Sequence, residues 1–148
     1  MSSSEEKKTF EFLEHTADSY VAAYGKNLNE AFENAALAMF EVMTNVKDVK
    51  PEIEDSVEVH GSDEYALLYN WLEVLLVKFD TLGLLLSRFK IAKITRDAEG
   101  FTLVATVWGE KFDPKRHLQK VGVKAVTYHR MEIAQRPGDV TLKFILDI

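Results

Sequence analysis

The sequence contains no cysteine. Disulfide bonds, thiolate metal sites and cysteine nucleophiles are therefore excluded together, and cysteine usage says almost nothing about the compartment. Internal repeats, low-complexity segments and a linker that would separate two domains are also missing. The absence of all three favours one domain.

Long uninterrupted apolar runs are missing as well. The first eight residues, MSSSEEKK, have no apolar stretch and cannot be a secretory signal. The richest apolar run, ALLYNWLEVLLVKF from Ala66, is interrupted by Asn70, Glu73 and Lys78 and is too short to span a bilayer. We therefore expect a soluble, cytoplasmic protein without a membrane partner.

Familiar catalytic and nucleotide-binding signatures do not occur. The sequence has neither G-x-x-x-x-G-K-[ST] nor G-x-G-x-x-G to cradle phosphates, and no G-x-S-x-G frames a nucleophile. The four histidines do not show the spacing of zinc ligands: His15, His60, His117 and His129. The sequence thus contains no complete set of catalytic residues that predicts an enzyme.

The composition is that of a globular protein. Of 148 residues, 47% are hydrophobic and 28% are charged, which is enough apolar material for a proper core. We predict a flexible polar leader over residues 1–8 and a single domain over residues 9–148.

Charge is unevenly distributed along the chain. The net charge of −6 argues against a protein whose main role is to coat nucleic acid, because phosphate binding needs a positive field. Residues 111–130 nevertheless carry six Lys or Arg and one acid, a local charge of +5 that leaves −11 for the remainder. The basic segment is either a functional surface or a solvated loop.

Two amphipathic helices are predicted. Asn27 and Glu30 resemble a capping box, after which apolar residues at helical spacing predict a helix over residues 28–44. Ser62 or Asp63 caps a second helix, and Gly83 is placed to end it. Its apolar face consists of Leu67, Leu68, Trp71, Leu72, Leu75, Leu76 and Phe79.

Strands are predicted in runs rather than in alternation with helices. The turn residues of RPGD, 136–139, predict a hairpin between the last two strands. The order ββαβαββββ favours an α+β fold, a two-layer sandwich of two helices packed on a mostly antiparallel sheet. The strand segments are residues 9–15, 19–25, 53–60, 85–95, 101–110, 126–135 and 140–148.

Two polar stretches are candidates for a site. In EHTADSY, Glu14, His15 and Asp18 lie at the junction of the first two strands, where an ordinary turn is the simpler interpretation. The second stretch leads into a later strand, and a basic solvated hairpin loop with Pro114 in its turn is the alternative there. Its polar series is Glu110, Asp113, His117, Lys124, Thr127 and His129.

Three motifs in this order resemble the archease family: EHTAD near the start, GE…D…H……VKAVTYH late in the chain, and LDI at residues 146–148. The resemblance covers the whole chain after residue 8. It implies an accessory protein of the RtcB-type tRNA-splicing RNA ligase, and not a ligase itself. Such a chaperone-like cofactor promotes guanylylation of the ligase with GTP and multiple turnover in tRNA splicing, and broadens its nucleotide use.

The same resemblance implies a bound divalent cation, usually calcium, with Asp18, Asp147 and the terminal residue Ile148 as ligands. Carboxylates gathered at one point repel one another, and a cation or a lysine would offset that cost. Oxygen ligands suit calcium, magnesium or manganese. Lys124, matched in VKAVTY, is expected to act on the partner, and the alternative is that it only neutralises the carboxylates.

Two rival functions remain open. A metal-dependent phosphoester hydrolase or nuclease would use Asp18 and Glu110 as ligands and His117 or His129 as base. An RNA-binding module would use the basic segment to follow phosphates and Tyr128 to stack on a base. The acidic remainder disfavours the second, and we expect no strong direct binding of nucleic acid.

Overall fold

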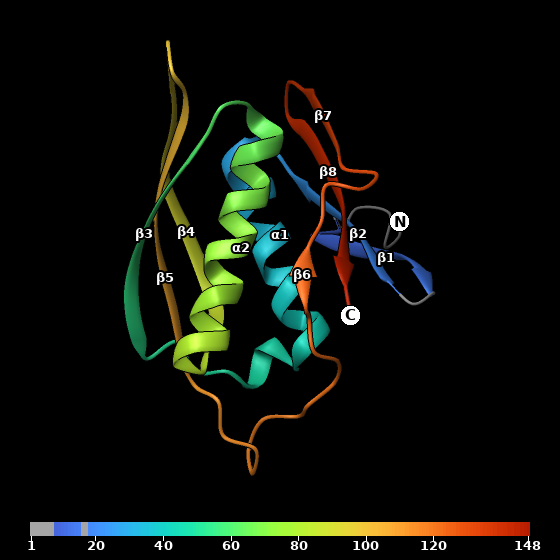
Figure 1. Cartoon of the computed structure of the whole chain (residues 1–148), viewed down its shortest axis with the longest axis vertical. Helices are drawn as coiled ribbons and strands as arrows, with labels where there is room; N and C mark the ends of the chain where they lie inside the picture. Colours follow the sequence, from blue (N-terminus) through green and yellow to red (C-terminus); the bar gives the residue numbers. More distant parts are fainter. Residues whose placement is uncertain (1–7, 16–17) are drawn as a thin grey trace, which may run out of the picture.

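The computed structural model describes residues 8–15 and 18–148 (Figure 1). The predicted leader, apart from Lys8, and the centre of the HTAD motif lie outside these residues. The elements in chain order are β1 (Phe10–His15), β2 (Asp18–Gly25), α1 (Leu28–Met43), the short 3₁₀ helix η2 (Val46–Asp48), β3 (Ile53–Gly61), α2 (Glu64–Leu82), β4 (Leu84–Asp97), β5 (Gly100–Lys111), β6 (Ala125–Val126), β7 (Glu132–Arg136) and β8 (Asp139–Asp147).

The strands form two antiparallel sheets, with both helices between them (Figure 1). One sheet has the order β3-β5-β4. The other has the order β1-β2-β8, and β6 and β7 share the remaining edge of β8. The α+β class and the packing of two helices on antiparallel strands are confirmed. The prediction of one sheet was too simple, because alternation of side chains shows which face is buried and not which strands pair.

Both helices begin where the sequence predicts. Asn27 caps α1 by accepting the N–H of Glu30 at 2.8 Å, and the Glu30 carboxylate accepts the N–H of Lys26 at 2.7 Å. Asp63 caps α2 by accepting the N–H of Ala66 at 2.8 Å. Gly83 ends α2 in the left-handed conformation at φ 67°, which glycine adopts without strain. Among the described residues, no helix is long and apolar enough to cross a membrane.

The core lies where the helices meet the two sheets. Fully buried aromatic residues fill it from both sides, including Phe32 and Phe40 of α1 and Phe144 of β8. Trp71 of α2 is buried too, and its indole N–H donates to the carbonyl of Phe32 at 2.9 Å. Burying an indole requires a partner for its one donor, so this bond fixes how α2 faces α1.

The strand predicted over residues 126–135 is divided. β6 and β7 both pair with β8, but a turn over residues 127–131 separates them. In this turn Arg130 adopts φ 59°, which is uncommon for a residue other than glycine. Composition gives no warning of the break, because residues 126–133 contain neither glycine nor proline. The hairpin predicted between the last two strands is confirmed as β7–β8.

Candidate functional site

Asp18 and Asp147 lie directly opposite each other. Asp18 begins β2, Asp147 ends β8, and the antiparallel register pairs the two residues. Cβ atoms of opposed residues are about 5 Å apart and project from the same face of the sheet. Asp147 is exposed and Asp18 half-buried, so both carboxylates lie at an accessible end of the five-stranded sheet.

A third segment is attached to Asp147 from its other side. The N–H of Lys124 donates to the carbonyl oxygen of Asp147 at 2.7 Å, and Ala125 pairs with Asp147 in the β6–β8 ladder. Residues from three regions of the sequence therefore meet here, with β8 in the centre. Lys124 is exposed, so its ammonium group is accessible to a partner.

Arg130 adds a cation on the same side of the sheet. Tyr20 and Asp18 are two residues apart on β2, so their side chains project from one face. The guanidinium carbon of Arg130 lies 4.4 Å from the centre of the Tyr20 ring, which is cation–π geometry. The sequence analysis missed Arg130. Its only sequence signal is its position directly after VKAVTYH.

The other half of the late polar stretch forms a buried cluster. His117 is 2% exposed and its Nε2 lies 2.9 Å from Glu110 Oε2, while the guanidinium of Arg116 pairs with Glu110 Oε1. The N–H of Lys50 donates to Glu110 Oε2 at 2.7 Å. His117 Nδ1 accepts the N–H of Asp113 at 2.9 Å, so in the neutral ring the hydrogen is on Nε2. This N–H donates a hydrogen bond to Glu110.

Glu110 is ionised in this cluster. Burial by itself raises the pKa of its carboxyl group, but the bonds from Arg116, the Lys50 N–H and His117 outweigh burial and lower the pKa to about 2. Asp113 accepts the N–H of Lys115 on its side chain at 2.9 Å. The structure thus uses Glu110, Asp113 and His117 to attach the basic loop to β5 and to residue 50. Whether these residues contact a partner stays a prediction.

The residues around the 127–131 turn have different environments. Thr127 donates its N–H and its hydroxyl to the carbonyl of Ile145, at 3.2 and 3.0 Å. Tyr128 is 51% exposed and stacks on Tyr69 of α2 with ring centres 4.4 Å apart, so one face of its ring is already covered. His129 is exposed. The side chain of His15 lies outside the described part of the chain.

The candidate site contains a pair of carboxylates, those of Asp18 and Asp147. Within residues 8–15 and 18–148, no group of three or more His, Asp or Glu side chains is placed to hold a metal ion. Glu110 contacts His117, but Asp18 does not join them in the single metal site that the hydrolase hypothesis requires. A cation at Asp18 and Asp147 would need further oxygen ligands, such as those of Ile148, water or a partner.

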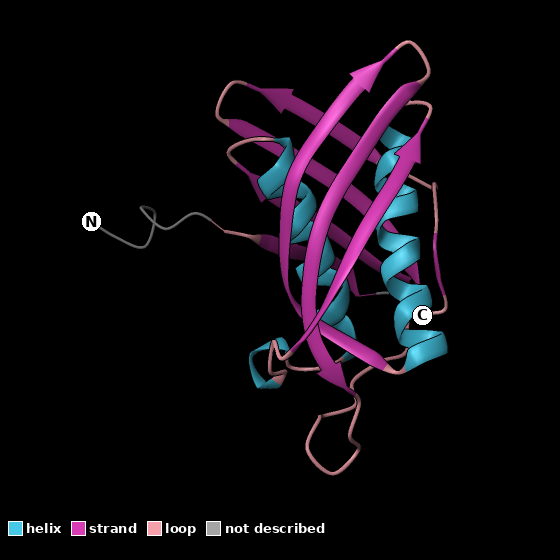
Figure 2. Cartoon of the chain, turned by 90° about the vertical axis from the view of Figure 1, so that its left-hand side faces the viewer, coloured by secondary structure: helices cyan, strands magenta, loops and turns pink. Residues whose placement is uncertain are grey.

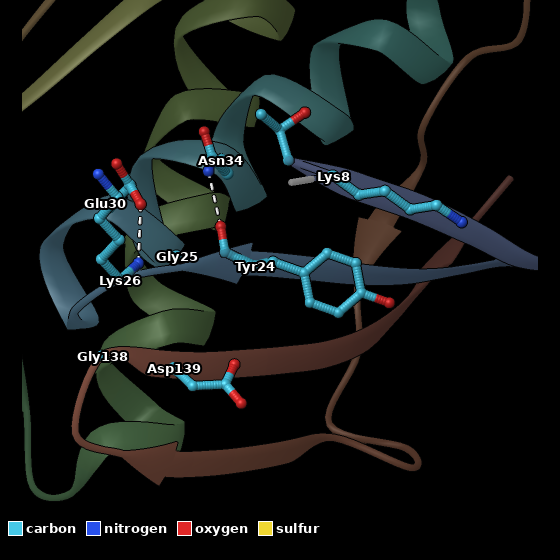
Figure 3. A pocket seen from close by; sticks show the side chains of 9 residues that line it. Lys8, Tyr24, Gly25, Lys26, Glu30, Asn34, Gly138 and Asp139 are labelled. Carbon is cyan, nitrogen blue, oxygen red and sulfur yellow. Dashed lines mark hydrogen bonds between the residues drawn. The ribbon is translucent and has the colours of Figure 1, made fainter. Parts of the chain in front are cut away.

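A wide hollow of 770 Å³ lies at the other end of β2, beside the start of α1 and the β7–β8 turn (Figure 3). Lys8, Lys26, Glu30 and Asp139 contribute charges of both signs to its lining. The amide of Asn34 donates to the carbonyl of Tyr24 at 2.6 Å, and both residues line the hollow. This hollow is separate from the Asp18 end of the strand and shares none of the predicted site residues.

Comparison with known proteins gives consistent results. The model of the Archease protein family (MTH1598/TM1083) matches residues 10–148. The protein archease of Sulfurisphaera tokodaii is 48% identical over 139 residues, which are 94% of this chain and 98% of that protein. The protein archease of Methanothermobacter thermautotrophicus is 45% identical over 141 residues, 95% of this chain and 99% of that protein.

Solved structures agree. The solution structure of Methanobacterium thermoautotrophicum protein 1598 has a TM-score of 0.82 at 45% identity, over 95% of this chain and 99% of that one. A Thermotoga maritima protein, described as an archease and possible chaperone, has a TM-score of 0.58 at 16% identity, over 92% of this chain and 94% of that one, and shares the fold. By its sequence over nearly its full length, this chain belongs to the archease family.

Proposed function

We propose that this protein is an accessory activator of an RtcB-type tRNA-splicing RNA ligase. It would act on the ligase rather than on RNA itself, promoting guanylylation with GTP, sustaining multiple turnover and broadening nucleotide use. Membership of the archease family and the resemblance of EHTAD, VKAVTYH and LDI support this role. The observation that carries it is the pairing of Asp18 with Asp147 beside Lys124, because these three residues come from those three motifs.

The donor set fits a hard divalent cation. Asp18 and Asp147 provide carboxylate oxygens from opposed positions, and Ile148 follows Asp147 with oxygens of its own. Calcium takes six to eight oxygen ligands in flexible geometry, so water or the partner would complete its coordination, and magnesium or manganese would use the same atoms. When bound, the cation would offset the repulsion between the carboxylates and present positive charge to the partner.

Lys124 is the residue that we assign to the partner. Its backbone N–H is hydrogen-bonded to Asp147, while its side chain is exposed. The side chain therefore starts from a fixed position, and its ammonium group can contact a partner. A lysine that served only to neutralise carboxylates would be expected to lie against them. Arg130, already stacked on Tyr20, can supply that neutralising charge instead.

The test is multiple-turnover ligation by a cognate RNA ligase, with GTP and with ATP, in the presence and absence of this protein. We expect the protein to raise turnover with GTP and to permit turnover with ATP. Asp18→Ala should abolish activation with the fold intact, because an accessible strand-end aspartate contributes about 1 kcal/mol or less to stability. Asp97→Ala is the matched control, since Asp97 ends a strand of the other sheet.

Calcium titration calorimetry on the same proteins separates the two parts of the proposal. Asp18→Ala should weaken calcium binding, because the number of charged ligands is a main control on affinity. Full activation by a correctly folded Asp18→Ala protein would remove Asp18 from the site. Turnover of a phosphoester by the isolated wild-type protein would favour the hydrolase instead.

A further inference from the structure

We propose that this protein forms a weak, salt-sensitive homodimer through the outer face of its three-stranded sheet, with β5 on the twofold axis. The inference is independent of the ligase proposal. The face in question is the one turned to the viewer in Figure 2, away from the helices, and the Asp18–Asp147 pair belongs to the other sheet. It is defined by the side chains of β3, β5 and β4 that point away from the core.

The face consists of four rows, each with one residue per strand. Directly opposed residues project from the same side of a sheet, so the registers of β3–β5 and β5–β4 give the rows. In the order β4, β5, β3 the rows are Arg88–Trp108–Glu54, Lys90–Thr106–Ser56, Lys93–Val104–Glu58 and Thr95–Thr102–His60. The β3 and β4 members are exposed, and the β5 members are half-buried.

Side-chain contacts occur within the first and fourth of these rows. The guanidinium carbon of Arg88 lies 4.6 Å from the centre of the Trp108 ring, and the Trp108 indole donates to Glu54 Oε1 at 3.1 Å. His60 Nδ1 lies 3.0 Å from the hydroxyl of Thr102 in the fourth row. The first and fourth rows are therefore joined by side-chain contacts, and the two rows between them follow from the register.

The charges of the face are separated by strand. β4 contributes Arg88, Lys90 and Lys93, β3 contributes Glu54 and Glu58, and β5 between them is uncharged. Within residues 8–15 and 18–148, none of the three β4 cations forms an ion pair. A basic column and an acidic column thus lie side by side, with an aromatic and aliphatic strip between them.

A second copy is the occupant that this pattern fits. A twofold axis parallel to β5 places β4 of one copy over β3 of its partner, so that Arg88 faces the partner's Glu54 and Lys93 faces the partner's Glu58, each pair occurring twice. Trp108 then meets the same residue of the partner near the axis. An axis across the strands would instead place cations on cations. The charges therefore select one isologous arrangement.

The small size of the face indicates a transient association rather than a permanent one. Strands about 4.8 Å apart and eight residues long cover about 14 by 26 Å, or roughly 750 Å² for both partners together. Stable complexes bury about 1,200 Å² or more, so we expect a transient dimer with a dissociation constant near 10⁻⁴ M.

Protection of an open sheet edge does not account for the face as a whole. Lysines and bulges on edge strands discourage the addition of another strand, and β4 has two bulges. Those devices act in the plane of the sheet. They require neither Trp108 in the central column nor carboxylates on β3, and both are needed for self-complementarity.

Sedimentation at concentrations up to about 1 mM, at low and high salt, tests the proposal. We expect wild-type protein to dimerise, and raised salt to weaken the dimer at least tenfold because the pairs are exposed. Arg88→Glu and Glu54→Arg should each be monomeric, since each change replaces two attractions with two repulsions. Lys47→Glu makes the same change of charge on η2 and should dimerise like wild type.

Mixing the two variants gives the decisive measurement. An Arg88→Glu chain and a Glu54→Arg chain have two attractive pairs between them, so the mixture should form a heterodimer, as the double variant should form a homodimer. Thermal melts establish that each variant is folded. A wild-type protein that stays monomeric at 1 mM, or a mixture that does not associate, would overturn the proposal. The proposal would also be overturned if the charge reversals abolished binding of single-stranded RNA and left self-association unchanged.

Discussion

The two sheets of this protein are built in different ways. The three-stranded sheet is built from one continuous stretch of the chain, residues 53–111, with one helix between β3 and β4 and two bulges in β4. The five-stranded sheet combines the first two strands with the last three, and contains a divided strand and a left-handed Arg130. The candidate site lies in the second sheet. Both sheets contribute buried residues to the core, and the candidate site lies where segments distant in the sequence meet in the five-stranded sheet.

Gly109→Ala should disrupt the three-stranded sheet, and we expect it to have the largest effect. A Cβ at Gly109 would overlap the carbonyl oxygen of Leu85 in the neighbouring strand, and a backbone atom cannot move aside cheaply. We expect a loss of more than about 4 kcal/mol in the free energy of unfolding, measured by denaturant titration. Gly122→Ala is the control, because a Cβ at that position meets nothing within 4 Å. A stable Gly109→Ala protein would show that β4 can shift its register.

Glu110→Gln should have the next largest effect. The pKa of Glu110 is lowered from 4.5 to about 2 by folding, so the ionised carboxylate stabilises the protein above pH 4.5 and that stabilisation is lost as the pH falls towards 2. We expect the substitution to cost about 2 to 3 kcal/mol at pH 7. It should also flatten the decline of stability between pH 5 and 2, roughly the window of this shift. Unchanged acid sensitivity in thermal melts at a series of pH values would contradict this account.

Lys124→Ala tests the candidate site of the five-stranded sheet and should leave the free energy of unfolding unchanged. If Lys124 acts on the partner, guanylylation of the ligase should fall several-fold, which corresponds to about 1 kcal/mol. Calcium affinity should hold or rise, because removing a nearby positive charge cannot by itself weaken attraction for a cation. Lys115→Ala is the matched control from the same basic loop. Unchanged guanylylation would make Lys124 an ordinary surface residue.

Tyr128→Ala should have the smallest effect. The Tyr128 ring stacks on Tyr69 at an angle of 4° between the rings, and an aromatic pair of this kind contributes about 1 kcal/mol. We expect a decrease of about that size in stability and no change in ligase activation. If the wild-type protein bound RNA and the Tyr128→Ala protein did not, the result would instead support the hypothesis that Tyr128 stacks on a base.

The local structure could be predicted well where residues within or next to an element set its boundaries. Both helix caps, the glycine that ends α2, and the starts and ends of β4 and β5 lie within two residues of their predicted positions. Capping and periodicity depend on residues close together in the chain, and such signals can be read directly. The division of the strands between two sheets could not be predicted, because it depends on pairing across more than 100 residues, as in β2 with β8.

The candidate site shows the same limit. The proximity of Asp18, Asp147 and Lys124 follows from β8 lying between β2 and β6, which no local pattern indicates, and those residues were named only through the family resemblance. The role of Glu110 and His117 in attaching a loop was also missed, because polar residues that bind one another look the same in sequence as polar residues that bind a ligand. Arg130 was missed because its contact with Tyr20 depends on a left-handed turn.

The central position of β8 has a consequence for how the protein is made. β1, β2 and α1 leave the ribosome early, but β2 cannot complete its hydrogen bonds until residues 139–147 have been synthesised. At 5–20 residues per second the interval is roughly 6 to 23 s, during which the edge of β2 that pairs with β8 has no partner strand. Pairing over so long a separation is also slow in itself. Nascent chains therefore can complete the three-stranded sheet first, and the aspartate pair forms only after Asp147 has been synthesised.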